Sequence, residues 1–141
     1  MKKFILLPIF ISLFISSSSA FSADVVYQPG RFPQLFENQK ITSGNSSTSS
    51  AIYIGDAQGN FSVQYDLSGP GDLKIEYLLS HDGSTYLEPS SASDISANVT
   101  NSTSPDIISF SPELAETLKI KVSETTSSSN VTSFNLWLGR Q

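Results

Sequence analysis

The chain has 141 residues, a formal net charge of −5 at pH 7 and no cysteine. The lack of thiols excludes disulfides, thiolate metal sites and a lipid-modified N-terminal cysteine. The few cations are scattered, which excludes the basic patch that binding to nucleic acid or to an anionic membrane surface requires.

The first twenty residues have the organisation of a secretory signal peptide. Met1-Lys2-Lys3 is a basic start, residues 4–15 are apolar, and small residues follow as far as Ala20. The apolar run is about a dozen residues long, too short to cross a hydrocarbon core of roughly 30 Å as a helix. We therefore expect cleavage after Ala20, with Ser22 as the second choice and an uncleaved anchor as the alternative. The mature chain would have no membrane span and would be periplasmic or extracellular in a bacterium.

Residues 21–50 are predicted to form an N-terminal arm and a serine-rich linker. Residues 24–41 contain many apolar side chains, while Pro29 and Pro33 prevent a long regular element. Residues 33–40 are expected to make one or two helical turns. An arm this apolar should pack on its own domain or on a neighbouring subunit. Residues 42–50 offer nothing to a core and are expected to form a flexible surface loop.

Residues 51–141 are predicted to form a single β-domain, because apolar side chains recur at every second position. In the last strand Phe134, Leu136 and Leu138 share one face and Trp137 lies on the other. A hairpin turn is expected at 81–84 with a returning strand at 85–87, an irregular segment at 90–104 and a helix start at 111–114. The predicted strands are 51–54, 60–66, 73–79, 107–110, 118–122 and 131–138.

Short strands at this spacing predict an all-β fold, an antiparallel β-sandwich with jelly-roll-like or immunoglobulin-like packing. The sandwich would follow the apolar arm and the cleaved signal peptide. The domain division is then 1–20, 21–50 and 51–141.

No catalytic constellation is evident, and we predict that the protein is not an enzyme. His81 is the only histidine and lies beside Asp82 in a predicted turn, where an exposed side chain is the ordinary outcome. No G-x-S-x-G elbow is present. Glu76, Asp82 and Glu88 flank one hairpin, so a carboxylate pair for acid–base catalysis is the alternative reading.

No cofactor is predicted either. Hard oxygen ligands suit calcium, but the EF-hand pattern is absent and aspartate favours turns for its own reasons. A structural calcium ion is thus an alternative that the spacing does not support. The aspartates at or near predicted loops are Asp56, Asp66, Asp72, Asp82, Asp94 and Asp106.

Three aromatic residues, Tyr53, Tyr86 and Trp137, are the candidate ligand-binding residues. Exposed aromatic faces stack on sugar rings or anchor protein interfaces. The alternative is that these side chains belong to the second face of a two-sheet core.

The hairpin at residues 75–86, with its Ser80-His81-Asp82-Gly83 turn, resembles discoidin-type, galactose-binding-like modules. The segments 110–112, 118–122 and 131–138 follow in a similar order. The C-terminal segment, Trp137 to Gln141, is similar to the ends of small exported or phage-associated β-proteins of unknown function. The resemblance implies a β-sandwich and transfers no binding residue.

These observations favour an exported non-catalytic protein that acts through surface contacts, as a binding or extracytoplasmic assembly component. Its partner would be another protein or a second copy of itself. A carbohydrate-binding module with a glycan ligand is one alternative. A virion or tail-associated structural protein of a phage is another.

Overall fold

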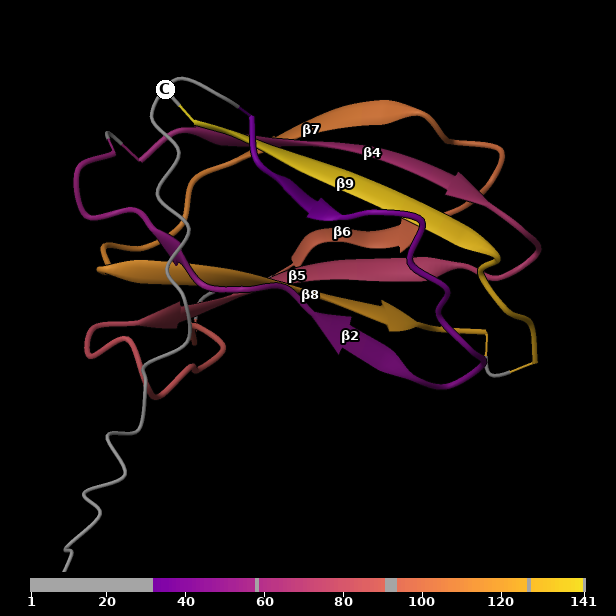
Figure 1. The fold of residues 1–141 in the computed structure, drawn as a ribbon, viewed down its shortest axis with the longest axis horizontal. Coiled ribbons are helices and arrows are strands. Elements are labelled where there is room, and N and C mark those ends of the chain that lie inside the picture. Colours follow the sequence, from indigo (N-terminus) through magenta and orange to yellow (C-terminus); the bar gives the residue numbers. More distant parts are fainter. Residues whose placement is uncertain (1–31, 58, 91–93, 127, 141) are drawn as a thin grey trace, which may run out of the picture.

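The computed structural model describes residues 32–57, 59–90, 94–126 and 128–140. The expected signal peptide and the beginning of the arm lie outside this range. The described residues form two stacked antiparallel β-sheets and contain no helix, which confirms the predicted all-β sandwich (Figure 1). The strands are β1 (Gln34–Phe36), β2 (Ser46–Thr48), β3 (Ile52–Tyr53), β4 (Phe61–Ser68), β5 (Leu73–Ser80), β6 (Asp94–Val99), β7 (Asp106–Phe110), β8 (Thr117–Glu124) and β9 (Ser133–Arg140).

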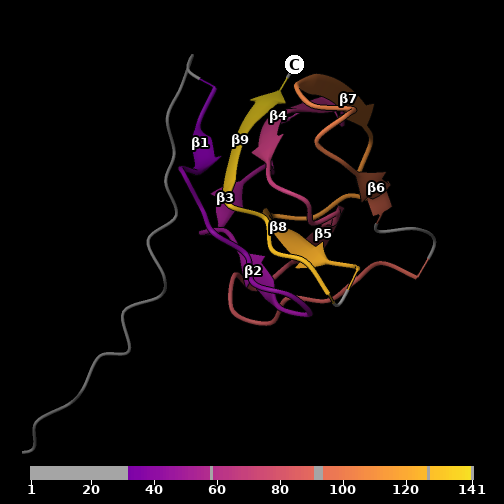
Figure 2. The ribbon, with the colours of Figure 1, turned by 90° about the vertical axis from the view of Figure 1, so that its right-hand side faces the viewer.

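The first sheet has the strand order β1-β9-β4-β7 and the second has the order β2-β8-β5-β6, with β3 also paired to β8. Figure 2 shows the two layers almost end-on, with β1, β9, β4 and β7 curving over the second sheet. The longest ladders are β4–β9 and β5–β8, each paired over eight residues. Both pairs are distant in sequence, so the fold is held by non-local contacts.

The core lies between the sheets and follows the predicted alternation. On β4 the buried side chains are Phe61, Val63, Tyr65 and Leu67, and on β9 they are Phe134, Leu136 and Leu138. Each fully buried side chain of this size contributes about 1.5–3 kcal/mol relative to an exposed one. The phenyl ring of Phe110 lies 5.6 Å from the rings of Phe61 and Tyr77, so it joins the two sheets.

The arm, as far as it is described, packs on its own chain. β1 pairs with β9, and the ring of Phe36 lies 5.7 Å from that of Phe134. Ile41 forms a β-bridge with Val131 and is 2% exposed. The predicted helical turns at 33–40 are wrong, because these backbone groups bond to β9 and its flanking loop instead.

Two polar segments that were predicted to be irregular contain strands. Within 42–50, β2 pairs with β8, and the Ser49 hydroxyl accepts a 3.0 Å hydrogen bond from the Ile120 amide where β2 gives way to β3. Within 90–104, β6 pairs with β5 and inserts Val99 into the core. Both are edge strands with few apolar residues, so hydrophobic periodicity does not reveal them.

The predicted helix start at 111–114 is also wrong. Instead, the chain just after this segment forms backbone hydrogen bonds with residues of the neighbouring strands and their ends. The Glu116 amide donates to the Ser80 carbonyl at 3.2 Å, and the Glu116 carbonyl accepts from the Ile54 amide at 2.9 Å. Leu114 is 90% exposed, so no apolar contact would support a helical turn here.

Candidate functional site

A shallow groove lies on the outer face of the first sheet, the face turned away from the core. Because outward positions alternate with core positions, paired strands align their outward residues in rows about 6.6 Å apart. One row contains, in sheet order, Gln34, Trp137, Gln64 and Ile107. The neighbouring row contains Gly139, Ser62 and Ser109.

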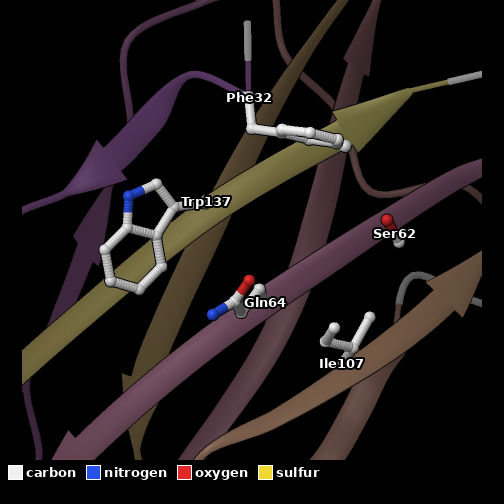
Figure 3. Close-up of a pocket in the computed structure, with 6 residues that line it drawn as sticks. Phe32, Ser62, Gln64, Ile107 and Trp137 are labelled. Carbon is white, nitrogen blue, oxygen red and sulfur yellow. The ribbon is translucent and has the colours of Figure 1, made fainter.

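A hollow of about 490 Å³ lies over these two rows. Sites for small molecules occupy about 300–1,000 Å³, so its size suits such a ligand. Figure 3 shows its two sides: Trp137 and Phe32 lie over β9, and the side chains of β4 and β7 lie opposite. The lining residues are Phe32, Ser62, Gln64, Ile107, Trp137 and Gly139.

The Phe32 ring packs directly against the backbone of Gly139. A Cβ atom on Gly139 would lie 2.9 Å from Cε1 of Phe32 and 2.6 Å from Oγ of Ser62. Such distances are too short for a real side chain, so only glycine lets the ring rest on the backbone of β9. Phe32 covers Gly139 yet remains 72% exposed itself. The ring is therefore presented to solvent as a wall of the groove.

A second hollow, of about 530 Å³, continues the groove beyond Phe32. It shares Phe32, Ser62, Ile107 and Gly139 with the first hollow. Its other lining residues are Asn60, Phe61, Ser109, Phe110, Ser111 and Arg140. Within it the Ser111 hydroxyl donates to Oδ1 of Asn60 at 3.3 Å. The two hollows thus lie side by side along the direction of β4.

The lining of the groove is almost uncharged. Among the residues that the structure describes, Arg140 is the single ionisable one that lines either hollow. Its guanidinium Nη1 lies 3.3 Å from the Tyr53 carbonyl and 3.5 Å from Oδ1 of Asp56. Ser62 and Gln64 have no side-chain hydrogen bond to any other residue of the described part. Their hydroxyl and carboxamide groups are available to a polar, neutral ligand.

The outer face of the second sheet is different, because its charges satisfy one another. Glu76 is 5% exposed and accepts ion pairs from two lysines, Lys74 at 2.8 Å and Lys121 at 3.3 Å. Lys74 also pairs with Asp94 at 2.8 Å, and Lys121 with Glu88 at 2.8 Å. Five charged side chains from three strands and a loop thus form one network, called here the charge network.

The charge network alters the protonation of its members. Hydrogen bonds to Asp94 and Glu76 raise the pKa of Lys74 well above its usual value. The hydrogen bond to Glu88 raises the pKa of Lys121, and the same bond lowers the pKa of Glu88. These shifts hold Lys74, Lys121 and Glu88 in their charged forms at neutral pH.

The three aromatic candidates lie in different places. Trp137 is half-buried on β9 and lines the groove. Tyr86 packs on the second sheet, where its hydroxyl donates to Oγ1 of Thr117 at 3.1 Å and the Lys119 ammonium lies 4.1 Å from its ring centre. Tyr53 lies on β3 and contacts the end of β9 through its carbonyl. The structure therefore does not combine them into one aromatic platform.

The turn that contains His81 is built around Asp82. Oδ1 of Asp82 accepts hydrogen bonds from the Thr85 amide at 2.8 Å, the Ser84 amide at 2.9 Å and the Ser80 hydroxyl at 2.8 Å. These bonds hold the pKa of Asp82 far below its usual range. The carboxylate thus serves to close a turn, and His81 is exposed beside it.

Most of the other aspartates proposed for calcium also lie singly beside a donor. Asp56 faces Arg140, Asp94 pairs with Lys74, and Asp66 accepts from the Ser104 hydroxyl at 3.2 Å. Among the described residues, no group of three histidine, cysteine, aspartate or glutamate side chains has the geometry to hold a metal ion. The described residues also contain no helix with the length and apolarity to span a membrane.

Sequence reasoning found Trp137 but missed the residues around it. Alternation along the predicted strand 60–66 places Ser62 and Gln64 on the side away from Phe61, Val63 and Tyr65, and that pattern alone points to this face. Phe32 and Gly139 gave no such signal, because their contact joins the arm to the last strand. Ile107, which is 63% exposed, was read only as part of an apolar strand.

No protein-family model matches the chain, and no curated protein matches it. Among solved structures, it is similar to the SPBc2 prophage-derived protein YomS. The sequences are 13% identical, the match covers 82% of this chain and 100% of that chain, and the TM-score is 0.44. A likeness at this level assigns no function.

Proposed function

We propose that this protein is an exported, non-catalytic binding protein that holds a neutral saccharide in the groove on the first sheet. One observation carries the proposal. Trp137 and the exposed ring of Phe32 lie over β9, opposite the hydroxyl of Ser62 and the carboxamide of Gln64, in a nearly uncharged hollow. Sugars present apolar faces between hydroxyl groups, and this combination of rings and neutral polar groups complements them.

The neutral lining favours a saccharide over the protein partner considered from the sequence. The predicted role as an assembly component depended on an apolar arm that would pack on a neighbouring subunit. In the structure, however, Phe36 and Ile41 of that arm are core residues of their own domain. A charged polymer is disfavoured because Arg140, the one cation among the described lining residues, already lies beside Asp56. The chain also carries a net negative charge, which would repel an anionic ligand.

The binding experiment is a calorimetric titration of the purified protein with soluble oligosaccharides of glucose, xylose, mannose, galactose and N-acetylglucosamine. We expect one class to bind and Trp137→Ala to weaken it about 30-fold, equivalent to the loss of about 2 kcal/mol at a central aromatic contact. Tyr86→Ala is the matched control, since Tyr86 is also half-buried but packs on the second sheet. It should leave the affinity unchanged.

The proposal fails if no saccharide binds, or if Tyr86→Ala weakens binding as much as Trp137→Ala. Self-association in sedimentation that Trp137→Ala abolishes would instead identify the groove as a protein interface. Export is tested separately by mass spectrometry of the protein recovered from a bacterial periplasm or medium. A mature N-terminus at Phe21 is expected, and an intact Met1 would contradict export by a cleaved signal.

A further inference from the structure

The groove has a repeating organisation along the strands that a single sugar unit would not use. Ser62 and Gln64 alternate with core residues on β4, so their side chains leave the same face about 6.6 Å apart. Asn60, the residue just before β4, lines the same groove. On the neighbouring strand Ser109 lies opposite Ser62, and Ile107 lies opposite Gln64. Hydrogen-bonding groups therefore recur along the whole floor of the groove.

The Phe32 ring stands over β9, beside this floor, where the two hollows meet. It lines both hollows, with Trp137 and Gln64 on one side of it and Asn60, Ser111 and Arg140 on the other. Each hollow, at about 490 and 530 Å³, is by itself within the range of small-molecule sites. Because the floor is the face of a sheet, the two hollows are joined along it and are not separate blind cavities.

From this geometry we infer that the groove holds an internal stretch of a linear, neutral oligosaccharide, bound across two subsites that meet at Phe32. The inference rests on the proposed function and specifies its ligand class. The Trp137 subsite stacks one unit between Trp137 and Phe32, with Gln64 as its hydrogen-bonding group. The Asn60 subsite lies beyond Phe32 and offers Asn60, Ser109 and Ser111 to the next units.

The first test is chain length. Titrations with the monosaccharide, disaccharide and tetrasaccharide of the class that binds should give an affinity for the tetrasaccharide at least tenfold above that for the monosaccharide. Reduction of the terminal sugar to its alditol should change tetrasaccharide affinity less than twofold, since an internal stretch makes the contacts. Equal affinities for all lengths, or loss of binding on reduction, would overturn the inference.

The second test separates the subsites. Asn60→Ala and Ser111→Ala should each weaken tetrasaccharide binding and leave monosaccharide binding at the Trp137 subsite unchanged. Gln64→Ala should weaken both. These side chains are exposed or partly exposed, so melting curves should show that the variants fold. If Trp137→Ala abolishes binding while Asn60→Ala and Ser111→Ala leave the tetrasaccharide unaffected, the proposed function stands and the two-subsite inference is wrong.

Discussion

The two sheets of this sandwich share one construction on their inner faces and differ on their outer faces. The second sheet pairs Glu76 with Lys74 and Lys121 and extends this pairing to Asp94 and Glu88. The first sheet presents Trp137, Gln64 and Ile107 in one row, none of them charged. A face whose polar groups satisfy one another has little to offer a ligand, whereas the first sheet leaves rings, hydroxyl and amide groups open to one.

The largest effect is expected where the charge network is broken. Glu76→Ala would leave Lys74 and Lys121 without their shared, nearly buried partner. Loss of charged hydrogen bonds of this kind costs about 1.5–3 kcal/mol. Chemical denaturation should show that decrease in the free energy of unfolding.

Gln64→Ala is the matched control for Glu76→Ala, since it truncates an outward residue at the middle of the other long ladder. It should change the free energy of unfolding by less than about 0.5 kcal/mol. An equal loss in both variants would show that the two outer faces do not differ in the way described.

A smaller effect is expected at Gly139. A Cβ atom there would overlap Ser62 and Phe32, and a side chain forced into a packed contact costs about 1–3 kcal/mol. Because Phe32 is exposed and free to move aside, Gly139→Ala should fall at the low end of that range. The substitution should nonetheless displace the Phe32 ring, which lines both hollows. Titration should therefore show a tenfold or greater loss of oligosaccharide affinity, while the melting temperature falls by only about 4–8 °C.

Acid should weaken the second sheet and its turn before the first sheet. The pKa values of Asp82 and Glu88 are lowered from the usual 3.8 and 4.5 by the hydrogen bonds that each accepts. The unfolded chain therefore takes up protons at higher pH than the folded one. The stability from these carboxylates is complete above the unfolded values and is lost as the pH falls below about 4.5 toward the folded values.

Melting temperatures measured from pH 6 to pH 3 should decline accordingly. In Asp82→Asn the decline should be shallower, because one titrating group is gone. A decline as steep as that of the unchanged protein would contradict the role given to Asp82.

The smallest effect is expected from salt. The outer ion pairs, such as Lys121–Glu88, are partly exposed and contribute at most about 1 kcal/mol each. Raising sodium chloride to 1 M should screen them and lower the melting temperature slightly. Saccharide affinity should not change, since the groove is nearly uncharged. Strong salt dependence of binding would point to an ionic ligand and against the neutral one proposed.

The inner faces of the long strands could be predicted from the sequence, because alternation of apolar residues fixes which side chains are buried. The inward Phe134, Leu136 and Leu138 and the outward Trp137 follow from that rule alone. The strands β2 and β6 could not be predicted, since they are edge strands made mostly of polar residues. Their partners in β8 and β5 supply the hydrogen bonds that define them.

The surroundings of the candidate site depended on pairing that no local pattern reveals. Phe32 meets Gly139 only because β1 pairs with β9, although the two residues are 107 positions apart in the chain. The burial of Glu76 likewise depends on lysines from β5 and β8 at once. Alternation along a strand determines which face of the sheet a side chain occupies. The pairing of strands that are distant in sequence determines which residues lie beside it.

The most direct test of the difference between the two outer faces is an amide-shift map. The isotopically labelled protein would be titrated with the oligosaccharide that binds, while its backbone amide signals are followed by NMR. The account predicts that the largest shifts fall on β4, β7 and β9, together with the indole N–H of Trp137, and that β5 and β8 stay unchanged. Shifts centred on the charge network, or on the loops at 81–89 and 113–116, would contradict it.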